Sequence, residues 1–391
     1  MDGVEKKIFH KRALIIQRRM TTYRVPLFDK MRARLAQDGI ALSVAYGTPM
    51  KSEVLREDQD ILPWGVRLPC RYLPVGAHRV VFQPIPRDMM RKQDLIIIPH
   101  ENRLFPAYLQ AYLYGSSGTR IAFFGHGANF QSRRKNGYAD RFKAWTADHA
   151  DWFFAYTSLS RDMIAANGYP EDRITCLNNS DDVSSLGAWQ KSVAPDELYA
   201  LRKTLGLNGN HVGVFIGSLY KDKMLDFLFL AADELRRRLP DFELVLIGDG
   251  PRRREINSFV KKRPWAFWVG AKQGREKVLH VSLGKVMLNP GLVGLNILDS
   301  FALGIPMVTT DCAFHSPEIA YLESGKNGLM VSVDVEEYVV AVEHLFADDG
   351  VRAAMISAGK EDAQRYSLDN MVENFCNGIS LALKSPKKLG R

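Results

Sequence analysis

The stretch 289–311 constrains the fold of this chain more than any other, because it combines a tight turn, a helix and a strand in quick succession. It follows the apolar run 286–288, and the Asn-Pro pair after that run cannot continue a central strand. Apolar side chains then recur at intervals of three, four and seven residues from Leu295, as on one face of a helix. Gly304 and Pro306 end that helix before a second apolar strand. Strand, turn, helix and strand in this order are typical of a parallel α/β sheet.

The turn before the helix has the features of an anion site. Gly291 and Gly294 let the backbone approach a ligand without a Cβ in the way. We expect the amides of Gly294 and Leu295 to be free at the helix N-terminus, where the helix dipole favours a phosphate. The carboxylate of Asp299, one turn later, could accept hydrogen bonds from ribose hydroxyls. The alternative is a plain strand–turn–helix of an α/β core, since such units are common.

The length of the chain indicates two domains. Its 391 residues, 46% of them hydrophobic, are enough for two ordinary cores. We expect a first domain at 1–190, a second at 205–368, and a final helix with a basic, disordered tail at 369–391. The segment 180–195 has the composition of a linker.

Composition also bears on the compartment. No run of about 18 apolar residues appears, and no signal-peptide core follows the N-terminus. The four cysteines are far apart and match no metal spacing, so we expect them to be reduced. These features predict a cytoplasmic protein that at most lies peripherally on the inner face of a membrane.

The charge balance suggests an anionic partner. The net charge is +9, from 53 Lys and Arg against 44 Asp and Glu. Nucleic acid, anionic lipid and a nucleotide sugar all satisfy this charge, but no RNA- or DNA-binding motif is present, so we expect no nucleic acid. The segment 132–145 interleaves basic and aromatic side chains, as a surface for anionic lipid headgroups does. A solvated helix face is the alternative for this segment.

The first half of the chain alternates apolar runs with helical patterns. The runs 13–16, 41–47, 94–99 and 121–124 predict strands of a parallel sheet, whose carboxyl ends meet at the ligand-binding edge. Tyr23 and Arg24 follow the first of them. His126 stands between two glycines after the last, and we expect it to be exposed and to serve a site there. A turn residue without a function is the alternative for His126.

The second half begins in the same way. The run 211–216 predicts a strand, and Ser218, Lys221 and Lys223 follow it before a helix. Two lysines at the carboxyl edge of a sheet suit a diphosphate, because they offer charge without a fixed geometry.

These motifs resemble those of retaining glycosyltransferases of the GT-B fold, in particular family 4. The family's donor motif is Glu-Gly-Phe-Gly-Leu, three residues, then Glu-Ala; aligned on Gly294, its second glutamate falls on Asp299 and its first on Gly291. The family lysine matches Lys223, whereas Ser218 stands where the family usually has arginine. Gly-His-Gly around His126, Gly-Asp-Gly-Pro at 248–251 and Gly-Leu-Met-Val at 328–331 are also similar to family segments.

The resemblance implies an α/β fold of two doubly wound Rossmann-like domains facing a cleft. It also implies roles for the residues singled out above. The donor diphosphate is expected to be bound by Lys223, Lys221, Ser218, Gly294 and Leu295, and the ribose by Asp299. The turn residues Gly291, Leu292 and Val293 are expected to contact the donor sugar, with His126 in a catalytic position near that sugar. Tyr23 and Arg24 are expected on the acceptor side.

The activity implied is transfer of a sugar from a nucleotide sugar to a saccharide or lipid-linked saccharide, with retention of anomeric configuration and without a metal or cofactor. In the mechanism proposed for the family, a donor phosphate oxygen helps to deprotonate the acceptor. Because Gly291 lacks the family's first acid, two alternatives stay open: a catalytically inactive nucleotide-binding or scaffold protein, and a nucleotide-sugar epimerase.

Overall fold

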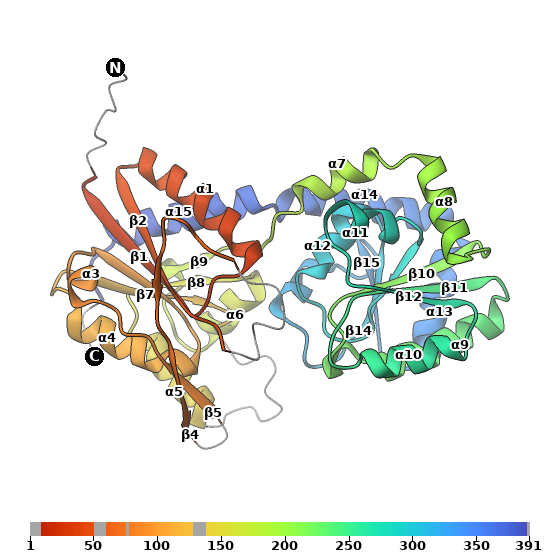
Figure 1. Ribbon diagram of the computed structural model, residues 1–391. Helices are drawn as coiled ribbons and strands as arrows, with labels where there is room; N and C mark the ends of the chain where they lie inside the picture. The colour runs from red at the N-terminus through yellow and green to blue at the C-terminus, as the bar shows by residue number, and fades with distance from the viewer. Residues whose placement is uncertain (1–8, 51–59, 76–77, 128–137, 389–391) are drawn as a thin grey trace. The chain divides into compact units, whose positions relative to one another are not determined.

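The computed structural model describes residues 9–50, 60–75, 78–127 and 138–388, and the chain divides into two compact units (Figure 1). Unit 1 comprises Met1–Asp182 and Leu368–Arg391, and unit 2 comprises Val183–Ser367. Each unit contains a parallel sheet with helices packed on both faces. The predicted α/β class with two doubly wound domains is therefore confirmed.

The sheet of unit 1 has seven parallel strands in the order β3-β2-β1-β6-β7-β8-β9. These strands are β1 (Lys11–Gln17), β2 (Ile40–Gly47), β3 (Val66–Leu68), β6 (Leu95–Pro99), β7 (Arg120–Gly125), β8 (Trp152–Ala155) and β9 (Ile174–Cys176). The strand order reverses between β1 and β6, which is the point where open α/β sheets bind ligands at their carboxyl edge.

The strands of unit 1 read as continuous apolar runs because both faces of the sheet are covered. Along β1, Ala13 and Ile15 face one core, and Leu14 and Ile16 face the other. All four side chains are fully buried. In a sheet with only one buried face, every second residue of a strand would be polar.

The helical elements of unit 1 follow its strands. They are η1 (Thr22–Arg24), α1 (Val25–Gln37), α3 (Arg87–Arg91), η2 (Asn102–Leu104), α4 (Phe105–Tyr114), α5 (Tyr138–Asp148), α6 (Ser158–Ala166), η3 (Glu171–Arg173) and α15 (Leu368–Lys384). Helix α15 lies beside α1 (Figure 1), where Lys30 pairs with Asp369 and Arg34 with Glu373.

Two parts of unit 1 were not expected from the sequence. The irregular region before β6 contains an antiparallel hairpin, β4 (Arg71–Val75) with β5 (His78–Phe82). The start of the tail, predicted to be disordered, packs on the sheet: Arg120 donates to Ser385 O, and Lys388 N donates to Asp151 Oδ1 at 2.6 Å.

The sheet of unit 2 has six parallel strands in the order β12-β11-β10-β13-β14-β15. They are β10 (His211–Ile216), β11 (Phe242–Ile247), β12 (Ala266–Gly270), β13 (Val286–Leu288), β14 (Met307–Thr310) and β15 (Gly328–Val331). Here the order reverses between β10 and β13, so the loops after these two strands meet at the ligand-binding edge of the sheet.

One helix of unit 2, α7, lies in the segment expected to be a linker. The helical elements are α7 (Ser184–Lys191), α8 (Pro195–Leu205), η4 (Lys221–Lys223), α9 (Leu225–Arg238), α10 (Arg253–Lys261), α11 (Gly274–Val281), α12 (Asn296–Leu303), η5 (Pro317–Tyr321), α13 (Val335–Ala347) and α14 (Asp349–Arg365). The linker prediction for 180–195 was wrong because Leu186 of α7 is buried in the core of unit 2. Helix α8 starts with a proline in its first turn and ends at Gly206 in a left-handed conformation.

Candidate functional site

The turn after β13 is held by two contacts from the loop after β10 and by one contact within the turn itself. Lys223 Nζ donates to Leu292 O at 2.6 Å, and Leu292 N donates to Asp222 O at 2.8 Å. Asn289 Nδ2 lies 3.3 Å from Gly291 O. The two loops expected to bind a diphosphate are therefore brought together at the strand-order reversal of unit 2.

Gly291 has no room for a side chain. A Cβ on this residue would lie 2.5 and 2.7 Å from the carbonyl carbon and oxygen of Lys223, and closer still to Asp222 O. These neighbours are backbone atoms, so they cannot move aside as a flexible side chain would. The two loops can therefore pack this closely only because residue 291 is a glycine and not the acid of the family it resembles.

Lys223 is a buried lysine, 5% exposed. Burial lowers the pKa of its ammonium group to about 8, because the charged form loses its hydration. The side chain is still mainly protonated at pH 7, and its proton is shared with Leu292 O. Lys221 and Ser218 precede it and are exposed, so they offer charge and a hydroxyl at the same edge.

The amides at the start of α12 differ from the prediction. Gly294 N donates to Asn296 Oδ1 at 3.0 Å, so the expectation of a free Gly294 amide was wrong. The short Asn296 side chain folds back over the turn, as asparagine often does before a helix. Leu295 is the N-cap residue of α12, and no acceptor for its amide is found within the described part of the chain.

Asp299 has a partner that the sequence analysis missed. Lys277 Nζ of α11 lies 2.6 Å from Asp299 Oδ1, and both side chains are largely buried. The pair joins the first turn of α12 to α11, which follows β12. The sequence around Lys277 did not indicate this ion pair, because only the order of the strands in the sheet brings α11 next to α12.

Unit 1 has a second cluster at the carboxyl edge of its sheet. The guanidinium of Arg24 is 2.9 Å from Asn179 Oδ1 and lies over the ring of Tyr156, 5.5 Å from its centroid. The ring of His126 meets the same Tyr156 edge-on at 4.8 Å. Tyr23 remains 41% exposed. The structure therefore joins Arg24 and His126 through Tyr156, a residue for which the sequence predicted no role.

His126 is half-buried, so the expectation of an exposed histidine was wrong. Burial, together with the charges of Lys143 and Arg24, lowers the pKa of its imidazole to about 4. A neutral imidazole donates one hydrogen bond from its N–H and accepts one at its other nitrogen, but it carries no charge. Arg24 is also buried, which places its guanidinium inside the cluster, whereas Tyr23 offers an accessible ring.

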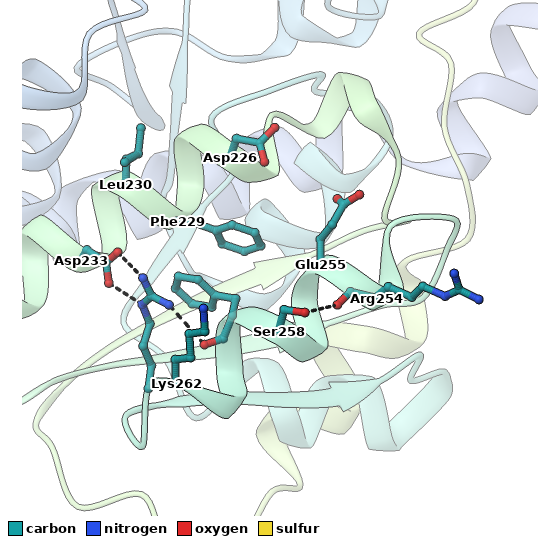
Figure 2. Close-up of a pocket in the computed structure, with 10 residues that line it drawn as sticks. Asp226, Phe229, Leu230, Asp233, Arg254, Glu255, Ser258 and Lys262 are labelled. Atoms are coloured by element: carbon teal, nitrogen blue, oxygen red, sulfur yellow. Dashed lines mark hydrogen bonds and ion pairs between the residues drawn. The ribbon is translucent and has the colours of Figure 1, made fainter.

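A cavity of about 560 Å³ lies elsewhere on unit 2, between α9 and α10 (Figure 2). Phe229 stacks on Phe259 at 4.1 Å in its floor, and Arg263 pairs with Asp233 at its rim. Figure 2 shows that its lining comes from these two helices and the residues that follow α10. None of the predicted site residues lines it, so this cavity is separate from the site at the strand-order reversal.

The described residues contain neither a metal cluster nor a membrane span. No group of three or more His, Cys, Asp or Glu side chains in that part of the chain is placed to hold a metal ion. No helix among those residues is long and apolar enough to cross a bilayer.

Known proteins are similar to this chain in two respects, namely the sequence of unit 2 and the fold. Residues 210–348 match the family model described as glycosyl transferases group 1. A sulfoquinovosyl transferase of Arabidopsis thaliana is 24% identical over 213 residues, which are 54% of this chain and 40% of the relative. A GDP-mannose-dependent alpha-(1-6)-phosphatidylinositol monomannoside mannosyltransferase of Mycolicibacterium smegmatis is 31% identical over 190 residues, 45% of this chain and 48% of the relative. The chain thus spans less than half the length of these curated relatives.

Solved structures resemble the chain over nearly its full length. The Anabaena protein HepE in complex with UDP-glucose superposes with a TM-score of 0.69 at 16% identity, covering 95% of this chain and all of that one. The lipopolysaccharide outer core galactosyltransferase WaaB has a TM-score of 0.64 at 15% identity and covers 94% of this chain and 99% of its own. At these identities the likeness establishes the shared GT-B fold.

Proposed function

We propose that this chain, whose residues 210–348 match the glycosyl transferases group 1 family, transfers a sugar from a nucleotide-sugar donor to an acceptor hydroxyl. The observation that carries the proposal is the pairing of the loop after β10 with the turn before α12, inside the family match at 210–348. As in the family it resembles, the reaction retains anomeric configuration and proceeds without a metal ion.

Unit 2 binds the donor in this proposal. Lys221, Ser218 and the Leu295 amide contact the diphosphate, and Lys223 adds a buried positive charge behind the turn. These groups offset the negative charge that develops on the leaving nucleoside diphosphate, and they are positioned before the reaction begins. Asp299, oriented by Lys277, accepts hydrogen bonds from the ribose.

Unit 1 supplies the acceptor side. His126 is neutral at pH 7, so it positions the transferred sugar by hydrogen bonding and does not act as a cation. Tyr156 fixes its ring. Tyr23 offers the exposed aromatic surface on which a saccharide ring stacks.

The relatives point to two donor classes. The structural neighbour HepE was solved with UDP-glucose, and the mycobacterial relative is described as GDP-mannose-dependent. We propose a UDP- or GDP-linked hexose as donor.

A lipid-linked saccharide at an anionic membrane surface is the acceptor that we propose. Helix α4 presents an exposed apolar stripe, with Leu109 47% and Leu113 64% accessible, alongside Phe105 and Tyr112. Arg103, just before this stripe, is paired with Glu101 at 2.8 Å. An exposed apolar helix face is suited to the boundary of lipid headgroups and acyl chains. The first part of the basic stretch predicted for this role, 132–137 within 132–145, lies outside the described residues.

The test is a thermal-shift screen of the full chain against UDP, GDP, ADP, CMP, UDP-glucose and GDP-mannose, followed by sugar-release and transfer assays with and without EDTA. We expect one nucleotide to stabilise the chain and its sugar to be released equally with EDTA present. Lys221→Ala should weaken binding without lowering the Tm, whereas Lys262→Ala, an exposed lysine of the α9–α10 cavity, should change neither. The proposal fails if no nucleotide or nucleotide sugar binds.

One observation favours a second candidate, a nucleotide-binding protein without transferase activity. No acid fits at Gly291, where the family it resembles contacts the donor sugar. Binding of a nucleotide sugar with neither hydrolysis nor transfer to any saccharide or lipid-linked acceptor would favour this candidate.

A further inference from the structure

One buried histidine of unit 2 has none of the roles proposed above. His315 lies between β14 and η5 and is 8% exposed. Its Nδ1 is 3.0 Å from Val293 N, and its Nε2 is 2.6 Å from Thr310 O. Ser316 N donates to Val293 O at 3.0 Å. Two consecutive residues thus hold both backbone polar groups of Val293, the middle residue of the turn.

These contacts require a neutral imidazole with its hydrogen on Nε2. A backbone N–H only donates, so Nδ1 must be unprotonated to accept from Val293. A carbonyl oxygen only accepts, so Nε2 must carry the hydrogen that points at Thr310 O. Protonation of Nδ1 would turn two N–H groups toward each other and remove the acceptor of the Val293 amide. The bond to the turn therefore exists in one protonation state only.

The surroundings of His315 favour that state at neutral pH. Titratable groups lie on each neighbouring segment, and these are Lys223 and Asp222 of η4, Asp311 and Cys312 of the loop after β14, and Glu318 of η5. Burial lowers the pKa of His315 below its ordinary value of 6.5, and the charge of Lys223 lowers it further. The Thr310 carbonyl and Asp311 act in the opposite direction but do not reverse the shift.

The rest of the turn depends on the same kind of contact. Leu292 is held on one side by Lys223 and Asp222, and Gly291 has no side chain with which to reach a ligand. The shape of the turn is therefore set by neighbours, of which His315 is the one whose hydrogen bonding changes when an imidazole takes up a proton.

We propose that His315 is a positioning residue, which holds the 292–294 turn in its donor-binding shape through the Val293 amide and releases the turn when the imidazole is protonated. The inference rests on the proposed function, because it takes this turn to be part of the donor-binding site.

The test is calorimetric titration of the full chain with UDP-glucose and GDP-mannose, from about pH 5 to about pH 7.5. Nucleotide sugars serve as probes because their diphosphate has no terminal phosphate, whose second pKa near 6 would add its own pH dependence. The variants are His315→Ala, His315→Asn and, as a matched control, His211→Asn. His211 pairs with Asp241 at the amino end of β10, away from the turn.

We expect wild type to bind its donor about fivefold more weakly at the acid end, the loss that one net hydrogen bond represents. His315→Ala should show that loss at every pH. In His315→Asn the amide oxygen takes the place of Nδ1 without titrating, so affinity should be near wild type and independent of pH across this range. His211→Asn should follow wild type. Wild-type affinity and pH dependence in His315→Ala would overturn the proposal.

Amide hydrogen exchange gives a readout that needs no donor. Exchange at Val293, followed in peptides spanning 289–296, should accelerate in His315→Ala and stay protected in His315→Asn. Unchanged exchange in His315→Ala refutes the role of His315, whereas failure of wild type to bind either nucleotide sugar refutes the proposed function. If His315→Ala does not fold, as judged by its thermal transition, the test rests on His315→Asn. Donor affinity that no longer falls at acid pH in this variant supports the proposal, and a fall equal to that of wild type refutes it.

Discussion

Adding a single methyl group at Gly291 should destabilise unit 2, and the geometry sets the size of the effect. The new Cβ would lie 2.5 and 2.7 Å from the carbonyl carbon and oxygen of Lys223. Because backbone atoms must move to relieve this overlap, we expect Gly291→Ala to lower the free energy of unfolding by about 1–3 kcal/mol. Gly291→Glu, which restores the family's acid, should cost at least as much and should not raise transferase activity.

Gly294→Ala is the matched control for this substitution. The atoms nearest to a Cβ on Gly294 are 3.7 and 3.9 Å away, which is ordinary van der Waals contact. Urea unfolding of both variants, with the thermal transition as a second probe, measures the difference. At about 2 kcal/mol, Gly291→Ala should lower the Tm of a unit of this size by about 4–8 °C. Equal stability of Gly291→Ala and wild type would refute the packing of the loop after β10 against this turn.

Three further predictions concern other parts of the molecule. Arg24→Met should destabilise unit 1 by about 2 kcal/mol in urea unfolding, because it leaves Asn179 Oδ1 without the guanidinium that now donates to it, whereas Tyr23→Ala, at an exposed ring, should have little effect. As pH rises through about 8, Lys223 loses its charge, so donor affinity measured by calorimetry should fall in wild type but not in Lys223→Met. Over the same rise its contribution to the free energy of unfolding should increase, since the unfolded chain then binds more protons than the folded one; a parallel fall of stability and affinity would contradict this. Leu109→Ser with Leu113→Ser should reduce co-sedimentation with anionic vesicles, while Leu230→Ser, equally exposed on α9, should not; equal losses would remove α4 from the proposal.

The strands were predictable because their signal is local. Runs such as 13–16 and 212–216 have no polar side chain, and burial on both faces of a parallel sheet is what such runs indicate. The turn–helix–strand after β13 was also predicted in its main features, including the end of α12 at Gly304, which the structure shows in a left-handed conformation. Helix α7 was missed because its composition resembles that of a linker, although Leu186 is buried in the core and Trp189 packs against it.

The site was predictable in its positions but not in its partners. Lys223 and the turn at 291–294 were placed at the right edge of the sheet, yet their direct contact depends on β10 and β13 being neighbours. The partners Lys277 and His315 come from segments 22 residues away along the chain from the residues they bind. Periodicity and turn chemistry act within a few residues, so only the strand order brings such pairs together.

The central claim is that unit 2 binds a nucleotide sugar between the loop after β10 and the start of α12. Hydrogen exchange of the full chain with and without saturating UDP-glucose or GDP-mannose tests this claim most directly. We expect the donor to protect the amides of 218–223 and 291–299. Protection of the α9–α10 cavity with none at these two segments, or no protection anywhere in unit 2, would contradict it.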